Sequence, residues 1–169
     1  MSPSQIVYRE AIQTDCPHLV GIHYAAVQAL ASGHYPADVL VAWSPPPDQA
    51  RCDWLAGLLA QDSVLCSVAA APDGQLAGFC IAAPGQSLLR AIYVHPAFAG
   101  SGVGRRLLQR AEAQCRDRGV EVLTLNASYN AVAFYVSCGY GVVGPVDHPL
   151  SDGTSMGAIR MVKDLKVAA

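Results

Sequence analysis

Residues 93–108 hold the part of the sequence best suited to chemistry, because an apolar strand ends there at a proline and a glycine-rich segment opens a helix. Glycines stand at alternate positions, 100, 102 and 104, and two arginines follow them. Glycine lets the backbone turn sharply and approach a ligand closely, and the first N–H groups of a helix are unpaired at the positive end of its dipole. The segment therefore predicts a phosphate site.

Spacing excludes two common phosphate loops. A Walker loop requires Lys and then Ser or Thr after its last glycine, but Gly104 is followed by Arg105 and Arg106. The dinucleotide fingerprint requires a third glycine at the position of Arg105. Neither pattern fits, and nucleotide binding through an unrelated glycine loop stays open as an alternative.

Two motifs together resemble the GNAT (GCN5-related) N-acetyltransferases. The first is Tyr-Val-His-Pro at the end of the strand, followed by the alternate glycines, the arginine pair and Leu-Leu, which is similar to the family's acetyl-CoA site. The second, at residues 130–140, is an asparagine that opens a short helix with Phe-Tyr and a final glycine before an aromatic residue. The resemblance covers residues 88–140 closely and the first half of the chain only loosely.

The resemblance implies an N-acetyltransferase that uses acetyl-CoA as cosubstrate and transfers the acetyl group to a primary amine by direct attack in a ternary complex. In that fold, two parallel strands splay and the pantetheine arm lies between them. Ala99 departs from the family's usual Arg or Gln, which removes a contact of about 1.5–3 kcal/mol at most. The implied coenzyme contacts are Ile92, Tyr93, Val94, Ala99, Gly100, Ser101, Gly102, Val103, Gly104, Arg105, Asn130, Ala133, Phe134 and Tyr135.

The resemblance also implies catalytic roles. Tyr135 stands where the family supplies a general acid to the departing CoA thiolate, and a phenol stays protonated at neutral pH. An ordinary core tyrosine is the alternative. The backbone N–H of Val94 is the implied donor to the oxyanion. Asn130 is implied to hold the pantetheine arm, and capping its own helix is a compatible second role.

The general base is not fixed by the sequence. Many relatives carry Glu or Asp on the strand before Tyr-Val, but Arg90 and Ala91 stand there. An alkyl ammonium with a pKa of about 10.4 must still lose a proton before it attacks. The candidate bases that could accept this proton are His34, His95, His23 and Tyr35. Of these, His95 stands at the end of the strand. Asp38 and Trp43 could shape an acceptor pocket. The alternatives are that Asp38 caps a helix and that Trp43 is an aromatic residue of the core.

The elements that position these residues predict an α/β fold with a mixed, mostly antiparallel sheet. One helix connects the strands at 88–95 and 120–126, so these two are expected to be parallel, and the resemblance implies that they splay. Residues 1–169 are expected to form a single N-acetyltransferase domain. The other strands are predicted near residues 6–9, 64–70, 76–83, 140–143 and 158–162, and the helices over 14–30, 36–43, 48–59 and 102–118.

Three local expectations accompany this pattern. Thr14 or Asp15 is expected to cap the first helix, whose apolar stripe runs through Leu19, Ile22, Ala26 and Leu30. The last two strands are expected to be joined by a long turn that contains Pro145, Pro149, Asp152 and Gly153. The residues of the helix at 102–118 expected to face the sheet are Val103, Leu107, Leu108, Ala111 and Cys115.

Composition argues against several partners. Charged residues make up 14% of the chain and the net charge is −2, so the basic field expected of a nucleic-acid-binding protein or of one bound to an anionic membrane is missing. No apolar run is long enough to span a bilayer and the start does not resemble a signal peptide, which predicts a cytoplasmic protein. Six cysteines, none in Cys-x-x-Cys spacing, are predicted to be core residues with no metal site, and Cys138 is the one candidate for a reactive thiol.

The acceptor is open at this level. The slightly acidic balance is compatible with a cationic small molecule such as a polyamine, an amino sugar or an amino acid, and a protein lysine or N-terminus is not excluded. Because Ala99 and the missing carboxylate weaken the match, a non-catalytic acyl-CoA-binding module is a further alternative. The oligomeric state is also open, a homodimer included.

Overall fold

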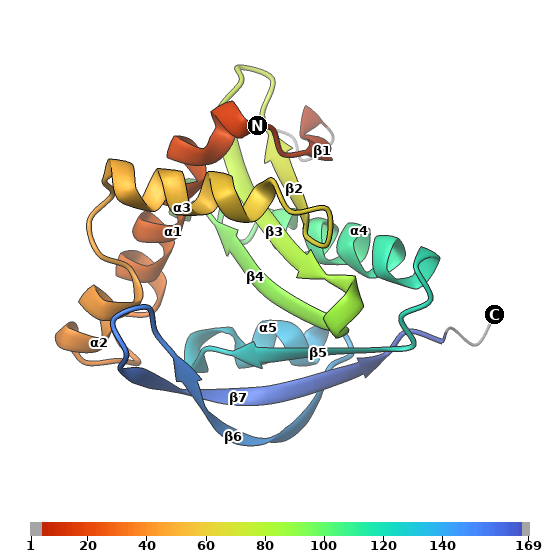
Figure 1. The fold of residues 1–169 in the computed structure, drawn as a ribbon. Helices are drawn as coiled ribbons and strands as arrows, with labels where there is room; N and C mark the ends of the chain where they lie inside the picture. The colour runs from red at the N-terminus through yellow and green to blue at the C-terminus, as the bar shows by residue number, and fades with distance from the viewer. Residues whose placement is uncertain (1–4, 167–169) are drawn as a thin grey trace.

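A computed structural model describes residues 5–166, and its strands form one seven-stranded mixed sheet (Figure 1). The strands are β1 (Val7–Glu10), β2 (Leu65–Ala70), β3 (Leu76–Ala83), β4 (Leu88–Val94), β5 (Val122–Ala127), β6 (Gly141–Pro149) and β7 (Ser155–Asp164). They are ordered β1-β2-β3-β4-β5-β7-β6, and every neighbouring pair is antiparallel except β4 and β5. The predicted fold class, with its single parallel pair, is confirmed.

Helices cover both faces of the sheet (Figure 1). They are α1 (Cys16–Leu30), α2 (Ala37–Trp43), α3 (Gln49–Leu59), α4 (Val103–Asp117) and α5 (Val132–Ser137). Strand β3 is apolar and buried along its whole length, as a central strand covered on both faces should be. Its Phe79 and Ile81 pack in the core that includes residues of α1 and α3, whereas Cys80 and Ala82 pack in the core that includes α4 and α5.

Helix α4 presents the predicted apolar face to the sheet. Its members are at most 3% exposed, namely Val103, Leu107, Leu108, Ala111 and Cys115. The helix ends before Gly119, whose φ of 84° lies in the left-handed region that glycine adopts without strain. All six cysteines are free thiols, and Cys16, Cys80, Cys115 and Cys138 are buried as small core residues.

The long turn predicted after residue 143 is wrong. Strand β6 continues through Pro145 and Pro149, and only residues 150–154 turn toward β7. β6 is the outermost strand of the sheet, paired on one side by β7. An edge strand tolerates proline because the missing N–H can lie on the side without a partner, so proline does not end the strand here.

Asp15 stands at the N-cap position of α1, as predicted, but its side chain does not cap the helix. The Asp15 carboxylate accepts the Ile12 N–H at 2.8 Å and makes a two-point ion pair with the Arg9 guanidinium at 2.8 and 3.0 Å. It makes no capping bond to α1, which carries Pro17 in its first turn. The same carboxylate therefore fixes a 3₁₀ turn (Gln13–Asp15) before the helix and ties it to β1.

The parallel pair β4–β5 separates almost as soon as it forms. Its one paired position is Leu88 with Thr124, whose N–H donates to the carbonyl of Ser87 at 2.9 Å. Beyond it, β4 keeps pairing with β3 as far as Val94, and β5 keeps pairing with β7 as far as Ala127. The carboxyl halves of β4 and β5 therefore each lack a partner on the side where they face one another.

Candidate active site

A pocket of about 290 Å³ lies at the carboxyl ends of the two separating strands. Open α/β sheets bind ligands at such points, where neighbouring strands part and a helix begins. The residues that line the pocket are Ala26, Val27, Leu30, His34, Trp43, Ile92, Tyr93, Val94, Gly104, Ser128, Asn130, Ala131, Phe134 and Tyr135. Seven of these fourteen residues are among the coenzyme contacts that the resemblance implies, and the other seven are not. The pocket is lined by residues from α1 as well as from α5.

The glycine loop leads into α4 beside this pocket. Gly100 and Gly102 have φ of 74° and 88°, conformations that L-residues rarely adopt, and Ser101 is held by hydrogen bonds from its N–H and hydroxyl to the Phe98 carbonyl. In the described part of the chain, four successive N–H groups, those of residues 102–105, donate to no other backbone group. They are the unpaired donors at the positive end of α4, beside Gly104, which lines the pocket.

Four of the implied coenzyme contacts, Arg105, Ala99, Ala133 and Val103, do not line the pocket. Arg105 is exposed and donates to the Ser137 hydroxyl at 3.1 Å, so its charge is held near the end of α5. Ala99 and Ala133 are exposed and do not line the pocket. Val103 is buried in the core under α4.

Tyr135 is the buried phenol of the site. Its side chain comes from α5, is 7% exposed and packs edge-on against Phe134, with ring centroids 5.2 Å apart. Burial, with smaller contributions from Cys80 and Tyr93, raises the pKa of the Tyr135 hydroxyl well above that of a free phenol. The hydroxyl is therefore protonated at neutral pH, and Tyr135 lines the pocket.

Asn130 has an unsatisfied side chain. Its Oδ1 atom is shielded from solvent and has no hydrogen-bond partner among the described residues. A short 3₁₀ helix (Tyr129–Ala131) precedes α5, and neither helix receives a side-chain cap, so the helix-capping role proposed for Asn130 is not observed. A buried carbonyl oxygen without a donor is costly, and one that borders a pocket is suited to an N–H of a ligand.

The candidate bases separate by position. His34 is exposed and lines the pocket, at the acceptor side expected from the sequence. His95 does not line the pocket, and its Nδ1 atom accepts the Ala97 N–H at 3.1 Å. Tyr35 is buried, and its hydroxyl donates to the Gly157 carbonyl at 2.6 Å and accepts the Tyr129 N–H at 3.0 Å. Of these three, only His34 is free to meet a substrate.

His23 is packed behind the pocket. Its Nδ1 atom lies 2.7 Å from the Ser44 hydroxyl and 3.1 Å from Nη2 of Arg51, which donates to it. Its ring lies against Tyr93, with centroids 4.3 Å apart. Burial, together with the Arg51 charge, lowers the pKa of His23 to about 3, so the imidazole is neutral at pH 7. Arg51 and Ser44 could not be predicted as partners of His23, because they lie 28 and 21 residues away from it in the chain.

The first helix contributes more to the pocket than the sequence predicted. Leu30 was expected in the apolar stripe against the core, but it is 43% exposed and lines the pocket together with Ala26 and Val27. Trp43 also lines the pocket, and its indole N–H donates to the Tyr93 hydroxyl at 3.2 Å. Helical periodicity marks these residues as apolar but cannot distinguish a core from a ligand pocket.

Comparison with known proteins decides the family. The model of the acetyltransferase (GNAT) family matches residues 24–140, which is more than half of the chain. The chain belongs to this family. A search of curated protein sequences found no match.

Solved structures share the fold over almost the whole chain. A GCN5-related N-acetyltransferase from Rhodopseudomonas palustris is 25% identical with a TM-score of 0.83, covering 97% of this chain and 98% of that one. PaiA N-acetyltransferase from Thermoplasma acidophilum, solved with coenzyme A, is 20% identical with a TM-score of 0.74, covering 94% and 98%. Phosphinothricin acetyltransferase from Sinorhizobium meliloti, solved with acetyl-CoA, is 17% identical with a TM-score of 0.72, covering 95% and 88%.

No helix among residues 5–166 combines the length and the apolar character needed to cross a membrane.

Proposed function

We propose that this GNAT protein is an N-acetyltransferase that moves the acetyl group of acetyl-CoA, its cosubstrate, to a primary amine by direct attack in a ternary complex. The observation that carries the proposal is the pocket itself. It opens where β4 and β5 separate, with unpaired helix N–H groups at one end and a buried, protonated phenol beside it. A core tyrosine with no access to a ligand would not line such a pocket.

The residues present fit the coenzyme. The free N–H groups of residues 102–105 suit its diphosphate, and the left-handed glycines before them keep side chains away from it. The unpartnered Oδ1 atom of Asn130 suits an amide N–H of the pantetheine arm. The backbone of residues 92–94, unpaired on the side facing β5, suits the same arm as a strand-like partner.

In the transfer step, the amine nitrogen bonds to the thioester carbon and the C–S bond then breaks. In this proposal the Val94 N–H donates to the oxyanion that forms. His34 takes the proton that the ammonium must lose before attack and passes it to solvent, because its side chain is exposed. Tyr135 gives its proton to the departing thiolate and regains one when the nitrogen loses its second proton as the amide forms. His34 thus takes the place of the strand carboxylate that this chain lacks at Arg90 and Ala91.

Two measurements test the function. Acetyl-CoA should raise the melting temperature and ATP should not, and mixing the protein with acetyl-CoA and a panel of amines should release CoA thiol with at least one of them. Stabilisation by ATP alone would favour the unrelated nucleotide site. Stabilisation by acetyl-CoA with no thiol release from any amine would favour the non-catalytic acyl-CoA-binding module.

A substitution separates His34 from a structural residue. His34→Gln should lower kcat/KM at pH 7 by about tenfold or more, because general base catalysis is lost. His18→Gln is the control, since His18 is an exposed histidine on α1 that does not line the pocket. Equal rates and equal pH profiles for the two variants would show that His34 is not the base.

A further inference from the structure

A second group of polar side chains lies on β5, β7 and β6, on the face of the sheet opposite α4. Asn126 alternates with Leu125 and Ala127, and Arg160 alternates with Ile159 and Met161, all four of which belong to the core that includes α4 and α5. Successive side chains of a strand point to opposite faces, so Asn126 and Arg160 share the other face. Neither residue lines the pocket described above, and neither was singled out from the sequence.

Strand register brings these side chains together at the edge where the sheet opens. Asn126 pairs with Arg160, and directly opposed residues of antiparallel strands have Cβ atoms about 5 Å apart. Asn126 stands two residues past Thr124, the last position of β5 that pairs with β4. Ser128, two residues further on, lines the pocket. Asn126 and Arg160 therefore flank the opening on the side away from the coenzyme loop.

One polar atom of the Asn126 side chain has no hydrogen-bond partner among the described residues. Its Nδ2 atom lies 3.3 Å from Nδ1 of His148, but its Oδ1 atom is shielded from solvent and has no partner among the described residues. Burial lowers the pKa of His148, so this neighbour is neutral at pH 7 and does not compete for a cation or repel one. A carbonyl oxygen in this condition is suited to an incoming ammonium.

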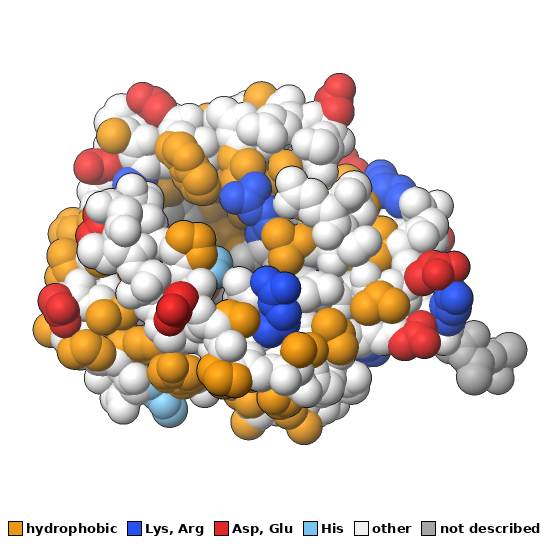
Figure 2. Space-filling view, turned by 60° about the horizontal axis from the view of Figure 1, so that its bottom comes forward, with side chains coloured by type: hydrophobic (Ala, Val, Ile, Leu, Met, Phe, Trp, Pro, Cys, Tyr) orange, Lys and Arg blue, Asp and Glu red, His pale blue; other side chains and the backbone are white. Residues whose placement is uncertain are grey.

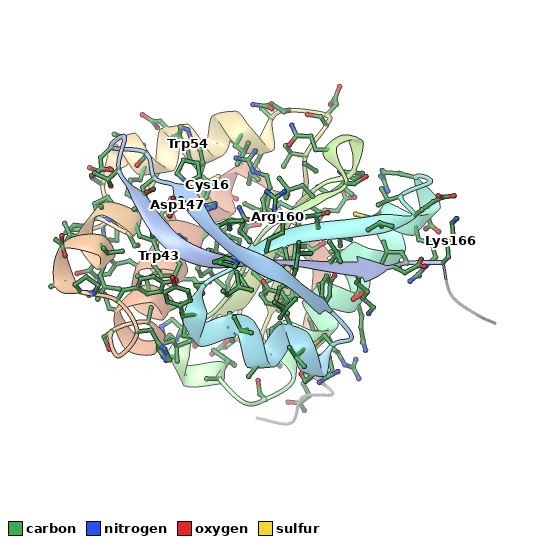
Figure 3. All side chains as sticks on the ribbon, turned by 90° about the horizontal axis from the view of Figure 1, so that it is seen from below. Cys16, Trp43, Trp54, Asp147, Arg160 and Lys166 are labelled. Atoms are coloured by element: carbon green, nitrogen blue, oxygen red, sulfur yellow. The ribbon has the colours of Figure 1, made fainter. Side chains whose placement is uncertain are left out.

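The Arg160 guanidinium has no ion-pair partner among the described residues. It is exposed, and no ion pair or side-chain hydrogen bond involves it within residues 5–166. Figure 3 shows it on the middle of the β5–β7–β6 part of the sheet. Figure 2 shows a face of the molecule on which Lys or Arg side chains stand among hydrophobic and uncharged ones. A guanidinium at such a place is suited to a carboxylate or a phosphonate.

We propose that Asn126 and Arg160 form the acceptor subsite and select a small amine that also carries an acid group on a short spacer. The Asn126 carbonyl holds the ammonium near the opening between β4 and β5, and the Arg160 guanidinium holds the acid. The short distance between the two positions in register favours amino-acid-like acceptors over long polyamines. This inference rests on the proposed transferase function and names its substrate class.

The test compares amines that differ in the acid group. The pairs are L-phenylalanine with 2-phenylethylamine, L-methionine with 3-(methylthio)propylamine, and 2-aminoethylphosphonate with propylamine. For each pair, kcat/KM is measured by CoA release in the wild type, in Arg160→Gln and in Arg118→Gln, whose exposed arginine bonds only to its own helix at Gln114. The ratio between variants cancels the different pKa values of the two amines.

The acid-bearing member of at least one pair should lose about tenfold or more in relative kcat/KM in Arg160→Gln and keep its advantage in Arg118→Gln. The carboxylate and phosphonate pairs show which acid the site takes. Asn126→Ala should raise KM for both members of a pair by a similar factor and leave their ratio unchanged, because the ammonium is common to both.

Two failures are distinguishable. Turnover with a ratio that Arg160→Gln leaves unchanged would overturn the subsite while the transferase function stands. No turnover with any amine, in a protein that melts as cooperatively as the others, would overturn the transferase function and the subsite with it.

Discussion

Tyr135 and Tyr140 are two neighbouring phenols with different surroundings. Their rings pack edge-on with centroids 5.6 Å apart in the same core. Tyr135 lines the pocket, whereas the Tyr140 hydroxyl is shielded from solvent and has no partner among the described residues. Burial raises the pKa of both hydroxyls, so neither loses its proton at neutral pH. Access to the pocket, and not acidity, therefore distinguishes the proposed general acid from its neighbour.

We predict that Tyr135→Phe lowers kcat by about a hundredfold or more and leaves the Kd of acetyl-CoA nearly unchanged. The reason is that the ring still packs but the departing thiolate no longer receives a proton. Steady-state kinetics and calorimetric titration with acetyl-CoA measure the two quantities.

Tyr140→Phe is the matched control. It removes a buried hydroxyl that no partner satisfies, so it should leave the rate unchanged and raise the free energy of unfolding by up to about 1 kcal/mol. Equal rates for Tyr135→Phe and Tyr140→Phe would show that Tyr135 is an ordinary core tyrosine.

At the scale of elements, α4 has a glycine in the left-handed conformation at each end. Gly102 caps its start with φ of 88° and Gly119 follows its end with φ of 84°, and a Cβ atom at either position would meet no other group within 4 Å. The conformation alone, and not a steric clash, therefore requires glycine at both positions. Only the first of the two glycines lies beside the free N–H groups.

Gly102→Ala and Gly119→Ala should each lower the free energy of unfolding by about 1–2 kcal/mol, because alanine is strained in the left-handed region. Gly102→Ala should in addition weaken acetyl-CoA binding by about tenfold as the loop amides turn away from the diphosphate, and Gly119→Ala should not. Chemical denaturation and acetyl-CoA titration on both variants check this. A similar loss of affinity in both would mean that stability, and not loop geometry, controls binding.

The sequence predicted those elements whose signals are local. β1 to β5 begin and end within two residues of their predicted positions, because alternating apolar runs are bounded there by turn residues. The hairpin β6–β7 was predicted too short, since Pro145 and Pro149 read as turn signals until the strand is known to be at the edge. Whether a strand lies at the edge depends on the order of all the strands in the sheet, so the residues of that strand alone do not reveal it.

In the candidate site, too, the residues of contiguous motifs could be predicted, whereas contacts between distant residues could not. The glycine loop and the Phe-Tyr helix are contiguous motifs and could be found by inspection. The Arg51–His23 and Asn126–His148 contacts join residues 28 and 22 positions apart, and no spacing rule connects them. His34 and Trp43 could be named from the sequence as pocket residues, but the contacts between distant residues could not.

At the scale of the molecule, the sheet has a weak seam between β4 and β5, where a single residue pair joins its two parts. Tyr35 helps to close this seam. It follows α1, stacks on Tyr129 with centroids 5.0 Å apart, and bonds to the Tyr129 N–H after β5 and to the Gly157 carbonyl of β7. One side chain thus fastens the helical half to the β5–β7 half at the rim of the pocket.

Tyr35→Phe should cost about 2–3 kcal/mol of unfolding free energy, because it leaves a backbone donor and a backbone acceptor without their partner. It should also raise KM for the amine, since the rim loosens. Tyr24→Phe on α1 is the control, as no side-chain hydrogen bond of Tyr24 is seen among residues 5–166. Denaturation curves in which both variants lose the same stability would contradict this role for Tyr35.

The buried His23 predicts how the stability of the whole molecule depends on pH. Its pKa falls from 6.5 in the unfolded chain to about 3 in the folded protein. Between these values the unfolded chain binds a proton that the folded protein does not, so stability is full above about pH 6.5 and falls as the pH is lowered. The slope is about 1.4 kcal/mol per pH unit, or about 2 kcal/mol between pH 6.5 and pH 5.

His23→Gln should remove this part of the pH dependence, because glutamine can still accept the Arg51 N–H but binds no proton. Denaturation at pH 7.5 and pH 5 should therefore show a loss in His23→Gln that is smaller than in the wild type by about 2 kcal/mol. The contribution of His148, whose pKa is also lowered, is common to both proteins and cancels. His18→Gln, which removes an exposed histidine of the same helix, is the control for the loss of a histidine. The contradicting result would be that His23→Gln loses as much stability as the wild type between pH 7.5 and pH 5. It would mean that His23 binds its proton in the folded protein as well, which its contact with the Arg51 guanidinium opposes.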